Sequence, residues 1–399
     1  MRVCGAWAPA VLAAGATSDC APAGLWNGSR PVVAALQAAA RDAAAARRRG
    51  GAFTATQRRA AAAGERAAWA ACAAMHAAAG AVAHPMESRL WRLRRQARAP
   101  GWVGLWVPWH ALSVPWHARR GPLRDAVRTL WTHLGVADGA RSGPRFFTVM
   151  VQAHVEQARE AVPGLDFARV VVFDTRWTAL GAIAGVPSAP AAAAARVPTP
   201  LLEFPGGHAP QSPAASATRT TSIFWAGACH SRVRCSLRAA LGGGVRACGD
   251  VLAPDAFDAA LRDATWALAP RGTTHASFML ARAVLAGALP VVVDDATPAC
   301  ASRESCCDPA FAPRAPPPPR GAARTVAARL PYADLGVDWD RIGLVAHASD
   351  VSGLGARIRA VDDVHSRRAR VAALQPLFTP RGVAAYVAFK LAACFDAGG

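Results

Sequence analysis

The sequence predicts an α/β protein built from two domains with parallel sheets. Its 399 residues are enough for two hydrophobic cores, because domains usually contain about 100–200 residues. Short runs of strand-forming apolar residues alternate with segments of helical periodicity, which is typical of parallel sheets with crossover helices. A stretch rich in Pro, Ala, Ser and Gly at residues 185–219 separates two such series. With 53% apolar and 18% charged residues, the composition excludes a disordered polyelectrolyte.

The expected domain boundaries follow from these changes in composition. Residues 1–84 are expected to form an Ala- and Arg-rich N-terminal region, residues 85–200 a first α/β domain, and residues 201–220 a linker. Residues 221–399 are expected to form a second α/β domain that ends in closing helices. Within residues 31–83 large apolar side chains are few, which predicts one or two loosely attached helices. A basic arm that binds nucleic acid is the alternative for this region.

The N-terminal residues resemble a signal peptide only loosely. Arg2 precedes a weakly apolar run at residues 6–16 that is rich in alanine and interrupted by Pro9. This run is much shorter than the ~20 residues that a membrane-spanning helix needs. Any membrane association is therefore expected only through this segment.

The charge and the cysteines narrow the class of protein without naming a partner. The formal net charge of +19 suggests an anionic partner such as nucleic acid, an acidic glycan, a nucleotide or a membrane surface. Lys390 is the only lysine, and a joint excess of Ala and Arg is also what a GC-rich genome imposes on tolerant surface positions. The ten cysteines include no Cys-x-x-Cys pair, which excludes zinc-ribbon and thioredoxin sites. Their even number suits disulfides in an oxidising lumen, and scattered buried thiols explain it equally well.

The first series of elements begins after residue 85. Runs at residues 101–108, 145–151 and 170–174 are apolar and rich in strand formers, and the third ends in Asp174. The segment 123–134 has helical spacing and stops at Gly135. This alternation predicts a mostly parallel, doubly wound sheet.

The second series contains one complete βαβ unit at residues 265–295. A strand at 265–270 is followed by a polar turn at 271–275, a helix at 276–286 and a buried strand at 289–293. The other predicted elements of this series are a strand at 221–226 and helices at 232–241, 255–264, 361–378 and 380–395.

The turn of this βαβ unit is a predicted anion site. It lies at the carboxyl edge of the sheet, where open α/β folds bind ligands, and at a helix N-terminus, where N–H groups without partners stabilise phosphate. Gly272 allows close backbone approach, Thr273 and Thr274 offer hydroxyls, and Arg271 can bind two phosphate oxygens. An ordinary turn with a solvated Arg271 is the alternative.

Several motifs support this interpretation. Ala-Leu-Ala-Pro-Arg-Gly at 267–272, followed by Ala-Gly-Ala-Leu-Pro-Val-Val-Val-Asp at 286–294, resembles the signature of exostosin-like glycosyltransferases, family 47. Together the similar segments extend over roughly residues 86 to 395. The others, in the order of the family, are residues 104–111, 145–151, 197–200, 223–227 with Arg232 and Arg234, and 330–335 with Asp338 and Trp339.

The resemblance implies a GT-B architecture, in which two Rossmann-like domains face each other across a cleft. It implies inverting transfer of a sugar from a nucleotide-sugar donor, expected to carry UDP, to a glycan or glycoprotein acceptor in the Golgi. It implies no obligatory cofactor or metal, and nucleic acid is not an expected partner. The implied donor-binding residues are Gly227, Arg232, Arg234, Pro270, Arg271, Gly272, Thr273, Thr274, Asp294 and Asp295.

The chain departs from the family pattern inside the presumed donor site. The family's helix arginine falls on Met279, its acidic residue on Arg282, and a later glutamate on Ala348. Two expected carboxylates are therefore absent. The alternative function is a non-catalytic relative that binds an acidic glycan or another anion.

Inverting transfer also needs a general base near the acceptor hydroxyl, normally from the first domain. His154 and Glu156, just after the strand predicted at 145–151, are the first candidates, and His110 and Asp174 are others. Trp109 and His110 are candidates for contact with the acceptor, although aromatic clusters at strand ends more often belong to the core.

Overall fold

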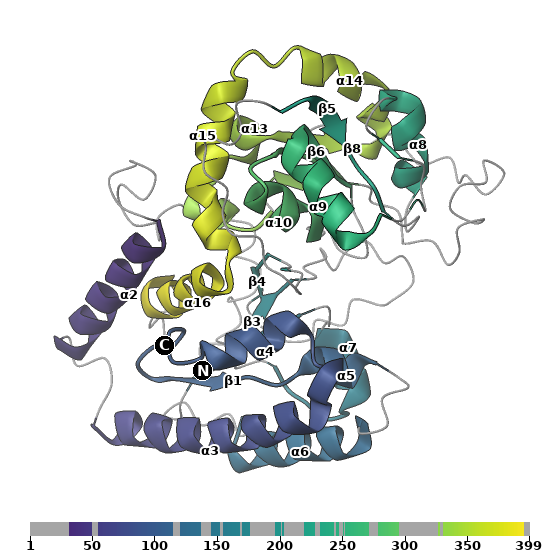
Figure 1. Cartoon of the computed structure of the whole chain (residues 1–399). Helices are drawn as coiled ribbons and strands as arrows, with labels where there is room; N and C mark the ends of the chain where they lie inside the picture. Colours follow the sequence, from purple (N-terminus) through teal and green to yellow (C-terminus); the bar gives the residue numbers. More distant parts are fainter. Residues whose placement is uncertain are drawn as a thin grey trace, which may run out of the picture. The chain divides into compact units, whose positions relative to one another are not determined.

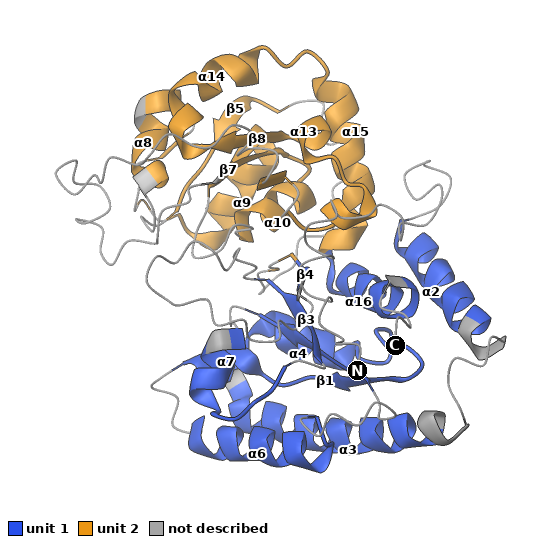
Figure 2. Cartoon of the chain, turned by 180° about the vertical axis from the view of Figure 1, so that it is seen from behind, with its two compact units in different colours: residues 1–177, 188–199, 379–399 blue, residues 178–187, 200–378 orange. Residues whose placement is uncertain are grey.

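The chain forms two compact units, which Figure 2 shows in different colours. Unit 1 contains residues 1–177, 188–199 and 379–399, and unit 2 contains residues 178–187 and 200–378. The structure is a computed structural model, and it describes residues 32–49, 55–114, 120–136, 145–151, 155–167, 170–175, 196–200, 202, 219–227, 232–242, 245–246, 250, 252–270, 278–294, 326–327 and 330–394.

Unit 1 is built on a four-stranded parallel sheet. The strands are β1 (Trp102–Leu105), β2 (Arg145–Met150), β3 (Val170–Asp174) and β4 (Arg196–Pro198), and they follow this order across the sheet. Every residue of β1 and β3 is buried, as is every residue of β2 after Arg145. Continuous apolar strands of this kind are expected where helices cover both faces of a parallel sheet.

Ring contacts show that both faces are covered. On one face, the Phe147 and Phe173 rings lie 6.3 Å apart edge to face, and Phe173 contacts Tyr386 of α16 (Pro380–Phe389) at 6.2 Å. On the other face, Thr148 accepts a hydrogen bond from the Trp109 indole of α5 (Trp109–Ser113). Phe147 and Thr148 are neighbours in β2 and therefore point to opposite faces.

The other helices of unit 1 pack around this sheet. Figure 1 shows α3 alongside α6, and residues of these two helices are in contact. The α2 helix contacts α16, which also packs against α4. Their bounds are α2 (Val32–Arg49), α3 (Ala55–Ala79), the short η2 (Gly80–Val82), α4 (Pro85–Arg92), α6 (Arg120–His133), α7 (Val155–Ala161) and the final turn η8 (Lys390–Cys394).

Two sequence-based expectations about unit 1 were wrong. The N-terminal helices are not loosely attached, because Leu36 of α2 and Cys72 and Met75 of α3 are at most 1% exposed. Alanine lets helices approach closely, so an alanine-rich face can be buried with few large side chains. The closing helix α16 belongs to unit 1 rather than to the second domain, since the chain returns there after residue 378.

Unit 2 contains a second parallel sheet of four strands. The strands β5 (Thr221–Phe224), β6 (Ala264–Pro270), β7 (Leu289–Asp294) and β8 (Leu344–His347) follow this order. Together with α10 (Phe278–Leu285), β6 and β7 form the predicted βαβ unit, in which Leu268 pairs with Val291. The α/β class and the two parallel sheets predicted from the sequence are thus confirmed.

The strand order of unit 2 reverses at β5. Trp225, directly after β5, forms a parallel bridge with Val245. Because β6 occupies one edge of β5, Val245 pairs along the other edge. The chain therefore crosses in one direction through α8 (Arg232–Leu241) to Val245, and in the opposite direction through α9 (Pro254–Asp263) to β6. Right-handed crossovers in opposite directions place α8 and α9 on opposite faces of the sheet.

The remaining elements of unit 2 follow β7. Leu335 and Trp339 are buried in the short elements that precede β8, and Tyr332 packs edge to face on Phe378 at 5.4 Å. The elements are η5 (Ala333–Leu335), α13 (Trp339–Ile342), η6 (Ala348–Asp350), α14 (Val351–Arg359), α15 (Val364–Leu374) and η7 (Gln375–Phe378).

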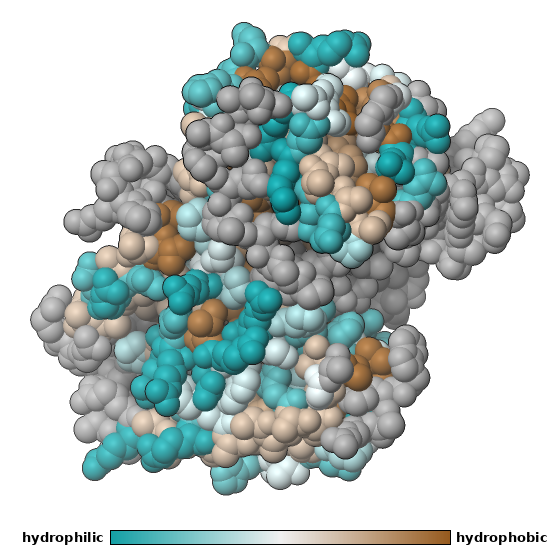
Figure 3. Space-filling view, viewed as in Figure 1, coloured by the Kyte–Doolittle hydropathy of each residue, from teal (hydrophilic) through white to brown (hydrophobic). Residues whose placement is uncertain are grey.

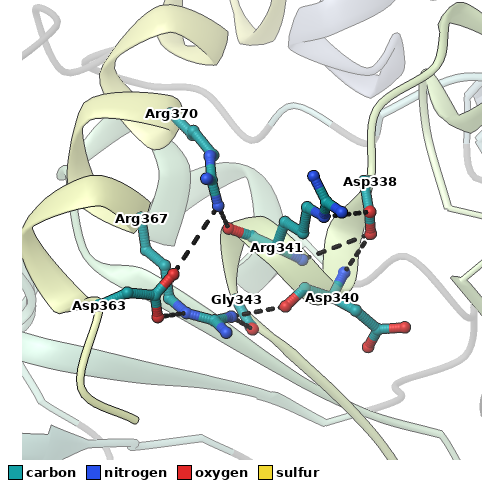
Figure 4. Close-up of polar contacts among 7 residues, drawn as sticks. All are labelled: Asp338, Asp340, Arg341, Gly343, Asp363, Arg367 and Arg370. Carbon is teal, nitrogen blue, oxygen red and sulfur yellow. Dashed lines mark hydrogen bonds and ion pairs between the residues drawn. The ribbon is translucent and has the colours of Figure 1, made fainter.

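A network of arginines joins α15 to the end of α13 (Figure 4). Arg367 pairs with Asp363 at 2.6 Å and donates to the carbonyl oxygens of Asp340 and Gly343. Arg370 donates to the carbonyl oxygen of Arg341 at 2.6 Å. These bonds satisfy carbonyl groups that the end of a helix leaves without partners. They fix the entry of the chain into β8.

Candidate functional site

The carboxyl edge of the sheet in unit 2 is the first candidate site. At this edge β5, β6 and β7 end near Gly227, Pro270 and Asp294, and Asp294 pairs with His347 at the end of β8. The reversal of strand order between Val245 and β6 makes the ends of β5 and β6 a topological switch point. Open α/β sheets bind ligands at such points.

Among the residues that the structure describes, Arg234 is a charged group at this switch point. It lies in the first turn of α8 and is only 5% exposed. Its Nη2 donates to the carbonyl oxygen of Pro270, the last residue of β6, at 3.3 Å. Burial lowers the pKa of Arg234 to about 10, so the guanidinium stays charged at neutral pH. The structure thus joins two predicted donor residues that are 36 positions apart in the sequence.

Several predicted site residues cannot be placed in this way. Gly227 follows β5 and is partly exposed. The backbones of Arg232, Asp294 and Glu156 are described at the start of α8, the end of β7 and within α7, but their side chains lie outside the description. The residues outside the described part of the chain are His154, Arg271, Gly272, Thr273, Thr274 and Asp295. The anion site at the turn 271–275 therefore stays a prediction.

The structure accounts for the two departures from the family pattern within α10. Arg282 pairs with Asp258 of α9 at 2.5 Å, and its guanidinium lies 4.2 Å from the centre of the Phe257 ring. Met279 is 2% exposed and packs in the core. Both positions thus serve the packing of α10. Ala348 opens η6 after β8, and it is only partly exposed.

The pair between Arg282 and Asp258 is expected to stabilise unit 2. Both side chains are largely buried, at 19% and 14% exposure, so removal of one charge leaves the other without its partner in a poorly solvated place. We expect Arg282→Met to lower the free energy of unfolding by about 1–2 kcal/mol, and a double-mutant cycle with Asp258→Asn to give a coupling of similar size. The exposed pair Arg128–Asp125 is the control, with an expected coupling under about 0.5 kcal/mol. Equal couplings in urea denaturation would contradict this account.

A second candidate site lies at the carboxyl edge of the sheet in unit 1. Glu87 of α4 is buried, and its carboxylate accepts the backbone N–H of His84 at 3.3 Å and that of His110 at 3.0 Å. The N–H groups of Val151 and Trp109 also donate to it. Burial raises the pKa of Glu87 to about 8, although the four backbone donors lower it. One carboxylate therefore ties the start of α4 to the chain after β1 and after β2.

Two imidazole rings lie beside this carboxylate. The rings of His84 and His110 meet edge to face at 5.6 Å. His84 caps α4, because its Nδ1 accepts the N–H of Met86 at 3.2 Å. Burial, and to a smaller extent the charge of His110, lowers the pKa of His84 to about 4. His110 is partly exposed.

The structure corrects the acceptor prediction at Trp109. This side chain is 1% exposed, and its indole N–H donates to Thr148 at 2.7 Å. Its ring also packs against Trp131 and Phe167. A buried indole with its donor in use cannot stack on a sugar, so Trp109 belongs to the core. Asp174 is buried at the end of β3.

Glu87 is not among the site residues predicted from the sequence, although a local pattern marks its position. His84-Pro-Met-Glu87 has a capping residue, a proline at the first helical position and a glutamate at the third, which is the pattern of a capping box. The pattern predicts the helix start. It does not predict that the same carboxylate also accepts N–H groups at the start of α5, because that contact spans 23 residues.

Arginines gather on one face of unit 1. Figure 3 shows hydrophilic side chains over α4 and the segment that follows it, where Arg92, Arg95 and Arg98 are exposed. Arg98 pairs with Glu65 at 2.6 Å, and Arg94 lies over the rings of Trp69 and Trp91. Part of the large positive charge is therefore used in internal contacts.

The described residues include no group of three or more His, Cys, Asp or Glu side chains placed to bind a metal ion. Among the described helices, none is both long and apolar enough to cross a membrane. Cys235 is in a disulfide, whereas Cys72 is a buried free thiol whose pKa burial raises to about 12. The chain therefore contains both a disulfide-bonded cysteine and a buried thiol, the two alternatives that the number of cysteines left open.

Comparison with protein-family models and with characterised proteins finds no match to the chain. The resemblance to exostosin-like glycosyltransferases therefore depends on the motifs themselves.

Proposed function

We propose that the chain is an inverting glycosyltransferase of GT-B type, which transfers a sugar from a UDP-linked donor to a glycan or glycoprotein in the Golgi lumen. One observation carries the proposal: the buried guanidinium of Arg234 lies at the switch point of the unit 2 sheet, bonded to the end of β6. Switch points of open α/β sheets bind the diphosphate of nucleotides, because a helix N-terminus follows the strand end there. A cation beside the strand end adds charge complementarity to the same ligand.

Other observations support this proposal. Two units with parallel sheets are what a GT-B enzyme requires, and β6, α10 and β7 form a parallel βαβ unit, the kind of unit that binds nucleotides in open α/β sheets. The disulfide at Cys235 suits an oxidising lumen. The family resemblance adds the inverting outcome and the Golgi location.

The test compares wild type with Arg234→Met, and uses Arg238→Met as control. Arg238 is exposed one turn further along α8, so its loss removes the same charge from the same helix without touching Pro270. We expect calorimetry to show UDP binding to wild type and to the control, and affinity about 10- to 100-fold weaker in Arg234→Met, as for a lost charge-assisted bond. Melting temperatures distinguish this loss from unfolding. No UDP binding or UDP release across a panel of UDP-sugars would refute the proposal.

A second function is favoured by α10. Arg282 and Met279 leave that helix without the carboxylate that the resemblance implies, and Arg282 is committed to Asp258. A non-catalytic protein that binds an acidic glycan or another anion is the alternative. Binding of UDP or heparin without UDP release from any donor would favour it.

A further inference from the structure

A cavity of about 720 Å³ lies in unit 1 at the amino end of β1, whereas the candidate sites above lie at carboxyl edges. It is lined by α2, α3, the segment from Gln96 to Trp102, and α16 with η8. Figure 2 shows α2 beside α16 and α3 beside α6, and α3 also packs on β1. Because α2 and α3 pack on different parts of unit 1, space remains between them. A volume of this size is typical of sites for small molecules.

Most of the cavity wall is apolar and consists of small side chains. The alanines that line it come from all the helical elements around it: Ala40 and Ala44 of α2, Ala61 and Ala62 of α3, Ala388 of α16 and Ala392 of η8. Side chains that end at Cβ do not fill the space between helices whose backbones are held by other contacts. Water in such a place has few hydrogen-bond partners, so an apolar group of a ligand binds favourably when it displaces that water.

The charged side chains of the cavity leave one positive charge over. Glu65 of α3 is 7% exposed, and its carboxylate pairs with Arg98 at 2.6 Å. Burial raises the pKa of Glu65, whereas the charge of Arg98 lowers it. Arg41 also lines the cavity and is exposed on α2, and among the described residues no carboxylate pairs with it. A ligand whose charge complements this cavity is therefore an anion.

We propose that this cavity binds a fatty acid, with the alkyl chain along the alanine side chains and the carboxylate on Arg41. Each methylene group that leaves water on binding is expected to strengthen binding about fourfold. A sugar fits less well, because its hydroxyl groups would find few hydrogen-bond partners along the alanines. An amine would have to displace Arg98 from Glu65. The proposal uses no residue of unit 2, so it is independent of the transferase activity proposed above.

The experiment is calorimetry of the full chain with dodecanoate, kept below the concentration at which it forms micelles. We expect dodecanoate to bind about 10-fold more tightly than decanoate, which has two fewer methylene groups. Ala62→Phe places a ring in the cavity and is expected to weaken dodecanoate binding at least about 10-fold, because the chain loses its space. Ala63→Phe is the control, since Ala63 is the next residue of α3, is exposed and does not line the cavity.

A second pair of variants tests the contact with the carboxylate. Arg41→Met is expected to weaken dodecanoate binding about 3- to 10-fold, as for the loss of one ion pair at a partly solvated site. Dodecanol has the same chain without the charge, so its affinity is expected to stay unchanged. Arg66→Met is the control, because Arg66 is exposed on α3 outside the cavity and its loss removes the same charge. Melting temperatures show whether each variant is folded.

Three results would each overturn the proposal. The first is a wild-type chain that binds no dodecanoate, or that binds it only in phospholipid vesicles. The second is unchanged affinity in a folded Ala62→Phe, which would place the ligand outside the cavity. The third is unchanged affinity in Arg41→Met, which would show that the carboxylate is not recognised there. If Ala62→Phe does not fold, the Arg41 variant and the comparison with decanoate decide. UDP binding is measured separately, so either proposal can fail without the other.

Discussion

Gly343→Ala is expected to lower the free energy of unfolding by about 3 kcal/mol, near the upper end for overpacking a core position. Gly343 lies between α13 and β8, where an added Cβ would overlap the carbonyl oxygen of Pro290 and lie 3.0 Å from its carbonyl carbon. This obstacle is backbone of β7, so no side chain can rotate away. The residue can adjust only by moving β8 from β7, which breaks the ladder between Val291 and Leu344.

The control for this prediction is Gly353→Ala within α14. A Cβ added at Gly353 meets no atom within 4 Å, and alanine is the better helix former. We therefore expect no loss of stability, and a gain of up to about 1 kcal/mol. Urea denaturation and hydrogen exchange of the β7 and β8 amides measure both variants. Equal stability of Gly343→Ala and wild type would show that β8 does not approach β7 as described.

The second large effect is expected on acidification, through His84. Its pKa is lowered to about 4 in the folded chain, from an ordinary value of 6.5, because burial disfavours the charged ring. Below pH 6.5 the unfolded chain therefore binds a proton that the folded chain does not. The contribution of His84 to stability is complete above pH 6.5 and is lost as the pH falls through 4. The full difference is about 3 kcal/mol.

His84→Asn isolates this contribution. Asparagine also caps helices but does not titrate, so the variant is expected to lose less stability than wild type between pH 6.5 and 4. Burial raises the pKa of Glu87 to about 8, so its contribution runs the opposite way and is lost as the pH rises from 4.5 through 8. The quantity to compare is therefore the difference between wild type and variant. His365→Asn, exposed on α15, is the control. If the free energy of unfolding changed equally with pH in His84→Asn and in wild type, the account would be contradicted.

Local patterning was sufficient to predict most of the strands. The apolar runs at residues 145–151, 170–174 and 289–293 correspond to β2, β3 and β7, because strands buried on both faces cannot tolerate charge. The βαβ unit predicted at residues 265–295 corresponds to β6, α10 and β7, again because its strands are continuous apolar runs. Helical periodicity located α6 and α8 within a few residues. What these predictions share is that each depends on residues close together in the chain.

The candidate site was only partly predictable. Arg234 and Pro270 were both expected to bind the donor, and the structure places them in contact. Trp109 was expected at the acceptor site because it follows a strand, yet it is buried against Thr148. Glu87 was not expected at all. The departures at Met279 and Arg282 could be seen in the sequence, but the partner of Arg282 could not, since Asp258 lies 24 residues away.

The sequence by itself determined the α/β class, the alternation of strands and helices, and the strand-turn-helix unit whose motif resembles exostosin-like glycosyltransferases. Each of these follows from local periodicity and turn chemistry, which depend on residues only a few positions apart. Only the tertiary structure decided that α2, α3 and α16 belong to unit 1, and that one carboxylate fixes two helix starts beside His110. Those outcomes depend on which surfaces bury each other over long stretches of chain, and such contacts leave no periodic signal in the sequence.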